Sequence, residues 1–308
     1  MNAGGRNMDR YVKPRLEHVQ GDTWCIVTGS CRIPLYMPHK DNAVMIDSGL
    51  KDPDRYSILG ILEQEKIHVS ALLTSHYHRD HIGNHSVIKD RFGAQVYMSP
   101  FTASVCSNGH QNTMGETGML TVLRGGHIKC NCDTMFDPEA LSIQAAGYDF
   151  KLIPLPGHAQ EHTGFVTPDD VAYLGDTILS RDILHAVRIP YCTFCKEDLE
   201  TKATVRSLKH QSYILAHNCV CSNISDLAQE NIDNMHDKIN MVERFTHSYI
   251  TLENLAAKVM TYTGADTDSL IKVLGNKRNV QVLVEYLLET GRLDIRARDG
   301  RIEYIKTT

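Results

Sequence analysis

Long apolar runs are missing from this 308-residue chain. No stretch approaches the ~18–20 consecutive apolar residues that a membrane-spanning helix needs, so we expect no membrane partner. The first twenty residues also lack the apolar core of a secretory signal, which predicts a cytoplasmic location. In that reducing compartment, the nine cysteines are expected to be thiols and not a disulfide framework.

A strong charge of one sign is missing as well. The chain carries 32 Lys and Arg residues against 37 Asp and Glu residues, which gives a net charge of −5. This mild balance does not support a global field for binding nucleic acid or a membrane surface. Residues 251–308 have nine basic and eight acidic side chains, whereas a nucleic-acid-binding domain is normally far more basic. A small-molecule substrate is therefore expected, and a nucleic-acid partner is disfavoured but left open.

Two regions of different pattern meet near residue 225. Before it, short apolar runs alternate with turn residues and helical patterns, which predicts a layered α/β structure. The expected strands are 24–27, 43–46, 71–74, 95–98, 152–155, 171–174 and 212–216, and the expected helices are 56–65 and 82–92. After it, we expect helices over 226–247, 252–262 and 266–290 and then a hairpin turned at Asp299-Gly300. Helices closed by a hairpin are typical of a winged helix, so we assign 1–225 to a catalytic domain and 226–308 to a smaller helical, winged-helix-like domain.

A group of metal-binding residue types follows one of the predicted strands. It is the run His76-x-His78-x-Asp80-His81, directly after the apolar segment 71–74. At a strand end, His76 and His78 point the same way because strand side chains alternate with a period of two. Where the chain turns into a helix, Asp80 and His81 can reach a second point nearby. Imidazoles and carboxylates bind zinc, and iron and manganese accept them too. The sequence therefore predicts a metal site here and not a histidine-rich surface turn.

These features resemble the metallo-β-lactamase superfamily, and within it the branch of glyoxalase II and related lactamase-like hydrolases. The resemblance covers roughly residues 20–220 and rests on five motifs in the family's order. They are Asp47-x-Gly49 after a strand, His76-x-His78-x-Asp80-His81, Gly157-His158, Gly175-Asp176 and Ala216-His217. The last motif departs from the family pattern, because Asn218 stands where glycine is usual.

The resemblance implies a four-layer αβ/βα sandwich with two divalent ions at one edge. Zinc is the expected metal, with iron and manganese as alternatives. The first ion would be held by His76, His78 and His158, the second by Asp80, His81 and His217, and Asp176 would bridge the two. Asp47 is expected to support the ligands and not to bind an ion. His158 is preferred over His162 as the ligand because it directly follows Pro156-Gly157.

The implied reaction is hydrolysis of a small acyl substrate, a thioester, lactone or other ester, by a metal-bound hydroxide. Asp80 would orient that hydroxide and later pass its proton to the leaving group, which makes it the expected catalytic residue. The stretch after Asp176 would reach the rim of the site. We therefore expect His185, Arg188 and Tyr191 to contact the substrate.

Three other interpretations stay open. A metal-dependent endoribonuclease is the first, because some lactamase-like hydrolases cleave RNA, although this chain has no long basic insertion or strongly basic tail. A mononuclear iron persulfide dioxygenase is the second, since those members keep the same His-x-His-x-Asp-His run. A metal-binding scaffold without catalysis is the third, and the intact ligand set speaks against it. A homodimer is also left open.

Overall fold

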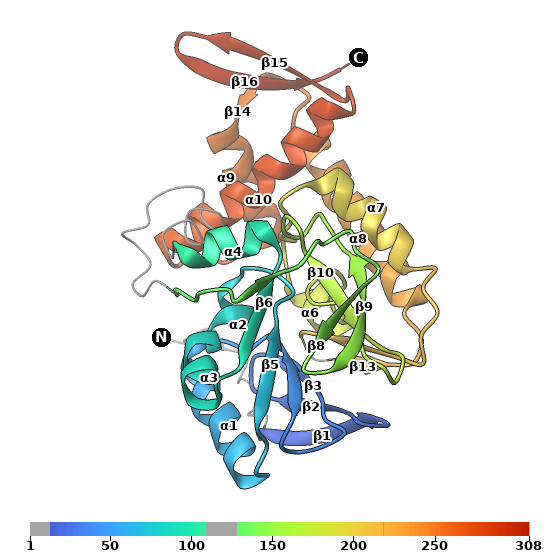
Figure 1. The fold of residues 1–308 in the computed structure, drawn as a ribbon. Coiled ribbons are helices and arrows are strands. Elements are labelled where there is room, and N and C mark those ends of the chain that lie inside the picture. The colour runs from blue at the N-terminus through green and yellow to red at the C-terminus, as the bar shows by residue number, and fades with distance from the viewer. Residues whose placement is uncertain (1–12, 109–127, 218, 308) are drawn as a thin grey trace, which may run out of the picture.

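Two mixed β-sheets face each other in the computed structural model, which describes residues 13–108, 128–217 and 219–307 (Figure 1). The first sheet has seven strands in the order β1-β2-β3-β4-β5-β6-β7. They are β1 (Arg15–Gln20), β2 (Thr23–Val27), β3 (Arg32–Tyr36), β4 (Ala43–Ile46), β5 (Val69–Leu73), β6 (Gln95–Met98) and β7 (Thr134–Met135). Neighbours from β1 to β4 are antiparallel and those from β4 to β7 are parallel. The carboxyl ends of β4 and β5 therefore lie at the same edge of the sheet.

The second sheet has six strands in the order β13-β12-β11-β10-β9-β8. They are β8 (Ser142–Ala145), β9 (Tyr148–Pro154), β10 (Thr163–Val166), β11 (Val171–Tyr173), β12 (Ser212–Leu215) and β13 (Cys219–Cys221). β11 and β12 are the parallel pair, and the other neighbours are antiparallel. The carboxyl ends of β9, β11 and β12 consequently point in one direction.

Alternating side chains of the strands build cores on both faces of each sheet. In β4, Val44 and Ile46 pack into the cluster between the two sheets, whereas Ala43 and Met45 pack into the cluster on the outer face. All four residues are buried, which is why this strand reads as a continuous apolar run and not as an alternation of apolar and polar residues.

Helices cover both outer faces. On the first sheet they are α1 (Lys51–Gln64), α3 (His85–Phe92) and α4 (Pro100–Ser107), and on the second α7 (Cys195–Val205) and the start of α8 (Ser225–Arg244). Two short helices, α2 (Arg79–Ile82) and α6 (Arg181–Ala186), lie in loops after strands of the sandwich. The order helix–sheet–sheet–helix confirms the expected four-layer αβ/βα arrangement. None of the described helices combines the length and apolarity needed to cross a membrane.

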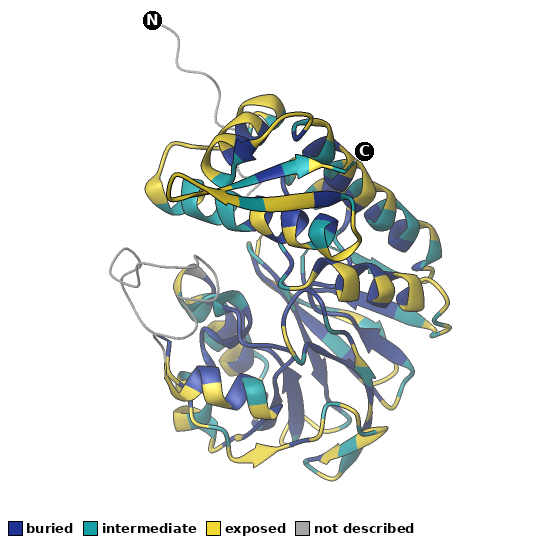
Figure 2. Cartoon of the chain, turned by 90° about the horizontal axis from the view of Figure 1, so that it is seen from above, coloured by how far each residue is buried: buried dark blue, intermediate teal, exposed yellow. Residues whose placement is uncertain are grey.

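The C-terminal region (residues 226–308) is helical and ends in a hairpin. It contains most of α8 and then β14 (Ile250–Thr251), α9 (Leu252–Thr263), α10 (Leu270–Glu289), β15 (Leu293–Arg298) and β16 (Arg301–Lys306). The three strands pair in the order β14-β16-β15. The hairpin turns at Asp299 and Gly300, both with positive φ, as the Asp-Gly pair predicts. Figure 2 shows this hairpin at the surface, largely exposed. The expected helices and hairpin are present, and β14 is an addition.

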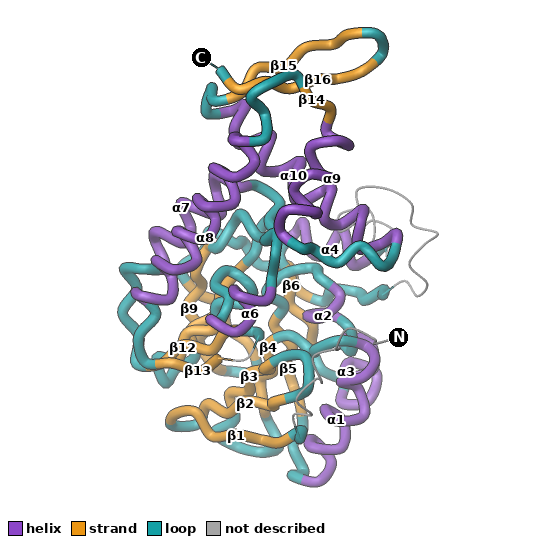
Figure 3. Tube along the Cα trace, turned by 180° about the vertical axis from the view of Figure 1, so that it is seen from behind, coloured by secondary structure: helices purple, strands orange, loops and turns teal. Residues whose placement is uncertain are grey.

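Helix α8 belongs to two cores at once. Leu227 and Ala228 near its start pack beneath the second sheet, whereas Met235 and Ile239 further along pack with α9 and α10. Figure 3 shows α8 running beside α7 and reaching α10. The expected domain boundary at residue 225 thus falls at the first residue of a continuous helix, and the side chains of that helix are shared between the two regions.

Candidate metal centre

Strand ends bring the predicted ligands to one edge of the sandwich. The segment after β5 carries His76, that after β9 His158, that after β11 Asp176, and that after β12 His217. Main-chain hydrogen bonds join the two sheets beside them. Thr163 N donates to Ser75 O at 3.0 Å, and Arg32 N donates to Ala216 O at 2.7 Å. The loops that carry the ligands are therefore fixed to each other and not only to their own strands.

The first cluster consists of His76, His78, His158 and Asp176, whose potential ligand atoms all lie within 4.8 Å of one another. His78 Nδ1 is 2.9 Å from His76 Nε2 and 3.0 Å from His158 Nε2. Asp176 Oδ2 is 3.5 Å from His158 Nε2. Burial lowers the pKa of all three histidines, that of His78 to about 3. The imidazoles are consequently neutral near pH 7, which is the form that binds a metal.

The second cluster consists of Asp80, His81, His217 and again Asp176. Asp176 Oδ1 is 3.3 Å from His81 Nε2 and 3.4 Å from His217 Nε2. Asp80 Oδ2 lies 3.5 Å from His217 Nε2. Burial opposes ionisation of Asp176, but His217 and His81 hold the pKa of its carboxyl well below the usual range. One oxygen of Asp176 faces each cluster. The two clusters together contain all seven residues that the sequence predicts as ligands.

The two clusters fit divalent cations. His81 Nε2 and Asp176 Oδ1 are buried and make no hydrogen bond, and an unsatisfied buried polar group costs ~1–3 kcal/mol. The three nitrogens of the first cluster cannot all satisfy one another, because each neutral imidazole has a single donor. One cation in each cluster would give every one of these atoms a partner, because nitrogen and oxygen ligands bind zinc at ~2.0–2.2 Å.

Asp47 supports the ligands from beneath. Its Oδ2 accepts hydrogen bonds from His81 Nδ1 at 2.7 Å, Ser75 Oγ at 2.6 Å and Tyr173 Oη at 2.7 Å. Its Oδ1 accepts one from Ser75 N at 2.8 Å. The bond to His81 orients that ring so that Nε2 faces Asp176. Asp47 contacts the second cluster through this ring, as expected for a residue that supports a ligand.

His162 has a structural position next to the centre and not in it. Gly175 has a φ of +51°, and a Cβ atom there would lie 2.3 Å from His162 Nε2. The His162 ring is held by Leu155 O at 3.2 Å and Thr177 Oγ1 at 3.1 Å from its Nδ1. Glycine at 175 therefore allows the Asp176 loop to pass over this ring, and His158 is the histidine of the segment that joins the first cluster.

Gly157 allows α7 to approach the loop of His158. It has a φ of +120°, and a Cβ atom there would lie 2.3 Å from the backbone of Asp198 in α7. The Asp198 carboxylate is buried and accepts a hydrogen bond from Lys202 Nζ, one turn along the same helix. Burial raises the pKa of Asp198, and the Lys202 ammonium opposes that rise.

A cavity of about 330 Å³ opens beside the metal centre. Three polar residues that line it, called here the polar wall, are His158, Asp176 and His217. Six apolar residues that line it, called here the apolar wall, are Leu179, Ile183, Val187, Ile189, Pro190 and Met235. The apolar wall comes from α6, the segments that flank it, and α8. The sequence does not single out any of its residues, because their spacing is that of an ordinary amphipathic helix.

Tyr191 is the one predicted substrate contact that lines this cavity. Its hydroxyl lies 3.2 Å from His78 Nε2. His185 and Arg188 are exposed and are not among the residues that line the cavity. Arg188 instead borders a separate hollow of about 440 Å³ against α9 and α10. The structure therefore does not bring His185 in α6 or Arg188 after it to the metal centre, because both side chains are exposed.

Arg278 of α10 reaches across from the C-terminal region to hold Tyr191. Its guanidinium carbon lies 4.1 Å from the centre of the Tyr191 ring, and its Nη1 donates to Cys192 O. The neighbouring Asn279 donates from Nδ2 to Ile189 O at 3.2 Å. Burial raises the pKa of Tyr191, so its hydroxyl keeps its proton. Sequence reasoning missed Arg278, since nothing in the chain links it to a loop 87 positions earlier.

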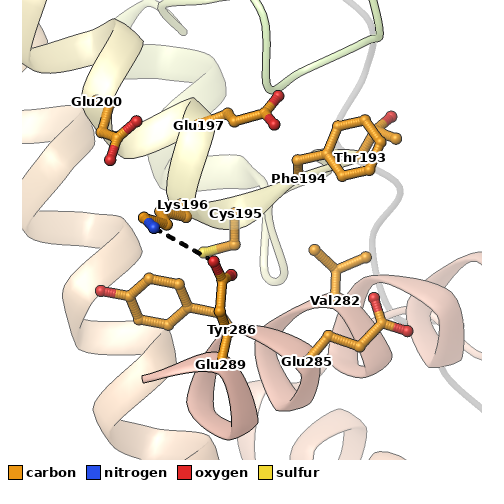
Figure 4. Close-up of a pocket in the computed structure, with 10 residues that line it drawn as sticks. All are labelled: Thr193, Phe194, Cys195, Lys196, Glu197, Glu200, Val282, Glu285, Tyr286 and Glu289. Carbon is orange, nitrogen blue, oxygen red and sulfur yellow. Dashed lines mark hydrogen bonds and ion pairs between the residues drawn. The ribbon is translucent and has the colours of Figure 1, made fainter. Parts of the chain in front are cut away.

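A further hollow of about 430 Å³ lies between α7 and α10 (Figure 4). Four glutamates line it: Glu197, Glu200, Glu285 and Glu289. Lys196 on its edge is paired with Glu289 at 3.3 Å. None of the predicted site residues lines this hollow. Its acidic lining is also unsuited to an anionic substrate, so the cavity at the metal centre is the better candidate site.

One family model matches the chain. It is described as "Metallo-beta-lactamase superfamily" and matches residues 35–209, which is more than half of the chain. Six of the seven predicted ligands fall inside this span, and His217 follows it. Four of the five motifs of the sequence lie inside this span, and Ala216-His217 follows it.

Relatives and solved structures point the same way. The hydroxyacylglutathione hydrolase GloC of Haemophilus influenzae is 26% identical over 146 residues, 46% of this chain and 64% of that protein. A hydroxyacylglutathione hydrolase of Xanthomonas oryzae is 28% identical over 138 residues, 45% of this chain and 42% of that protein. The chain therefore matches less than two thirds of the length of either relative. A metallo-beta-lactamase family protein from Thermus thermophilus has a TM-score of 0.66 at 17% identity, over 90% of this chain and 94% of that one, which shows a common fold.

Proposed function

Because this chain belongs to the metallo-beta-lactamase superfamily, we propose that it is a metal-dependent hydrolase that acts on a small acyl substrate, a thioester, lactone or other ester. The observation that carries this proposal is the pair of clusters that share Asp176, with one carboxylate oxygen facing each set of imidazoles. Relatives named for hydrolysis of hydroxyacylglutathione, itself a thioester, add support for an acyl substrate.

Seven residues would hold two divalent ions, and we propose zinc, because nitrogen and carboxylate donors suit it. The first ion would be held by His76, His78 and His158, the second by Asp80, His81 and His217, with Asp176 between them. When bound, two such ions supply an activated water at neutral pH and polarise the carbonyl oxygen of the substrate.

Two residues of the chain then handle protons. The Asp80 side chain is 34% exposed, and although burial opposes its ionisation, His81 and His217 hold the pKa of its carboxyl well below the usual range. It is therefore ionised and can orient the attacking water, hold a proton and release it to the leaving group. Tyr191 keeps its hydroxyl proton and can donate a hydrogen bond to the oxygen of the substrate carbonyl.

The C-terminal region has a supporting role in this proposal. We propose that residues 226–308 form a winged-helix-like domain that packs on a catalytic domain of residues 1–225. Arg278 and Asn279 of α10 hold the loop that carries Ile189 and Tyr191. The nine basic and eight acidic side chains of residues 251–308 leave this domain without the excess charge that RNA binding favours.

Metal content is the direct test. We expect about two equivalents of zinc or manganese in the full chain, one for each cluster, loss of metal in Asp176→Ala, and no loss in Asp182→Ala, a control at an exposed position of α6. The same proteins would be assayed with thioesters, lactones and esters. One equivalent of iron, or no tightly held metal, would contradict the dinuclear hydrolase. Cleavage of RNA without cleavage of any ester would assign the metals to an endoribonuclease instead.

A further inference from the structure

The apolar wall is a continuous surface built from three segments of the chain. Ile183 lies in α6, Leu179 precedes this helix and Val187 follows it, and all three side chains are half-buried. Ile189 and Met235 are buried at 3% and 2% exposure and extend this surface to the loop after α6 and to α8. The wall lines the same cavity as the side chains of His158, Asp176 and His217.

Asn231 and Lys202, which also line the cavity, are already hydrogen-bonded within the protein. Asn231 on α8 accepts a hydrogen bond from Leu179 N at 2.9 Å, and its Nδ2 donates to Leu179 O at 2.9 Å and to Leu227 O at 2.8 Å. Lys202 donates to the buried carboxylate of Asp198. An ammonium that left Asp198 to bind a substrate anion would leave a buried charge without a partner, which is strongly unfavourable.

Cations that could bind a charged acyl group do not line the cavity. Among the described residues that form it, Lys202 is the only lysine or arginine, and it is paired. His185 and Arg188, the nearby basic side chains, are exposed on the outer side of α6. The part of a substrate that lies in this cavity would therefore meet the methyl and methylene groups of the apolar wall and the metal ligands.

We infer that the acyl part of the substrate is an unbranched aliphatic chain, so that the enzyme hydrolyses apolar acyl esters or thioesters in preference to hydroxyacyl or other polar ones. This inference rests on the proposed function. The volume of about 330 Å³ lies at the lower end of the ~300–1,000 Å³ of small-ligand sites, which suits one chain and not a bulky or branched group. One water adds to the carbonyl carbon, the bond to the leaving oxygen or sulfur breaks, and a fatty acid and an alcohol or thiol are released.

The test is a chain-length series with the metal-loaded full chain. The p-nitrophenyl esters and matched thioesters of acetate, butanoate, hexanoate, octanoate and decanoate would be compared by kcat/KM. Each buried methylene is expected to raise kcat/KM about fourfold until the cavity is full, after which the values level off. A flat profile would overturn the inference. So would a higher kcat/KM for a hydroxyacyl thioester than for an alkyl one of equal length.

Two variants of neighbouring positions locate the effect. Ile183→Trp fills the cavity, so the preferred chain becomes shorter. Asp182→Trp adds the same side chain at an exposed position outside the cavity and leaves the profile unchanged. If Ile183→Trp does not fold, Ile183→Ala widens the cavity and shifts the preference to longer chains. An unchanged profile in either Ile183 variant would overturn the inference.

Binding of 1-butanol, 1-hexanol and 1-octanol, measured by calorimetry, separates this inference from the proposed function. An affinity that rises about fourfold per methylene and weakens in Ile183→Trp would support an aliphatic-chain site. If no ester is cleaved at the same time, only the proposed hydrolysis is contradicted, and the aliphatic-chain site stands. Cleavage of esters together with alcohol affinities that do not depend on chain length would leave the hydrolase in place and overturn the aliphatic site.

Discussion

The polar wall and the apolar wall of the cavity are held in place by different means. The polar wall stands on strand ends and is fixed by hydrogen bonds of buried groups, with Asp47 beneath it. The apolar wall stands on helices and a loop and is fixed by side-chain packing, with Arg278 of α10 behind it. In the proposed function, the sheets would hold the metal ligands, whereas the helical elements around them would select the substrate.

Removing Asp47 is the strongest challenge to the polar wall. Asp47→Ala leaves the donors of Ser75, His81 and Tyr173 buried without an acceptor, so we expect unfolding to require about 3–5 kcal/mol less free energy. Metal affinity should fall by about 10–100-fold, because the His81 ring loses its orientation. Urea unfolding and zinc titration measure the two effects. Asp41→Ala, at an exposed position, should change neither, and equal stability of the two variants would contradict the role given to Asp47.

Removing Met235 tests whether the apolar wall is independent of the metals. Met235→Ala opens a cavity in a buried cluster, which should lower the free energy of unfolding by about 2–5 kcal/mol, below or equal to the effect at Asp47. The metal content should stay the same, since Met235 belongs to neither cluster of potential ligands. Asp237→Ala, exposed on the same helix, is the matched control and should lie within about 0.5 kcal/mol of the parent protein. Loss of metal in Met235→Ala would show that the two walls are coupled.

Substituting Arg278 tests the comparison of the two walls further, because this residue supports the apolar wall and also contacts Tyr191. Arg278→Lys keeps the charge but loses the planar guanidinium that stacks on the ring. A cation–π contact contributes ~0.5–2 kcal/mol, so we expect kcat to fall by about tenfold with metal content and KM nearly unchanged. Lys277→Ala, whose exposed ammonium pairs with Glu253, is the control. An equal loss in both variants, or loss of metal in Arg278→Lys, would contradict a positioning role for Arg278.

The smallest effect is expected far from both walls, where Glu243 on α8 pairs with Arg292 before β15. The hydrogen bonds from Arg292 lower the pKa of Glu243, and the atoms Arg292 Nη2 and Glu243 Oε2 are 2.8 Å apart. Because the folded-state pKa lies below the unfolded one, the pair stabilises the protein above pH ~4.3 and this contribution is lost as the pH falls through the folded-state value. We expect less than about 1 kcal/mol.

Free energies of unfolding between pH 7 and pH 3 check this expectation. The difference between the parent protein and Glu243→Gln should shrink towards zero as the pH falls. Glu139→Gln, at an exposed position, should show no such trend. A difference that grows with acid would reverse the sign and reject the pair as its source.

The sandwich and the candidate metal ligands could be predicted from the sequence because both leave short-range signals in it. β4 and β6 begin and end where expected, since each is an apolar run bounded by turn residues. The seven predicted ligands stand in short motifs next to strand ends, and the structure brings all of them into two clusters. Their binding of metal remains a prediction.

Long-range pairings could not be predicted in this way. Arg278 and Tyr191 are brought together by the docking of α10, and no local pattern records that contact. His185 and Arg188 were expected at the substrate because they follow Asp176, but both are exposed and neither lines the cavity. Strands of two or three residues, such as β7, β13 and β14, are too short for a periodic signal and depend on their partners.

Helix α8 makes the two regions one cooperative unit. A boundary in an exposed linker would let each part melt on its own, but here one rigid segment supplies Leu227 to the core of the sandwich and Met235 to the core of the C-terminal region. Neither core can open without disturbing the other, so a single thermal transition is expected. Since Met235 also lines the cavity, a molecule bound there protects the distant hairpin of β15 and β16 from melting as effectively as it protects the sheets.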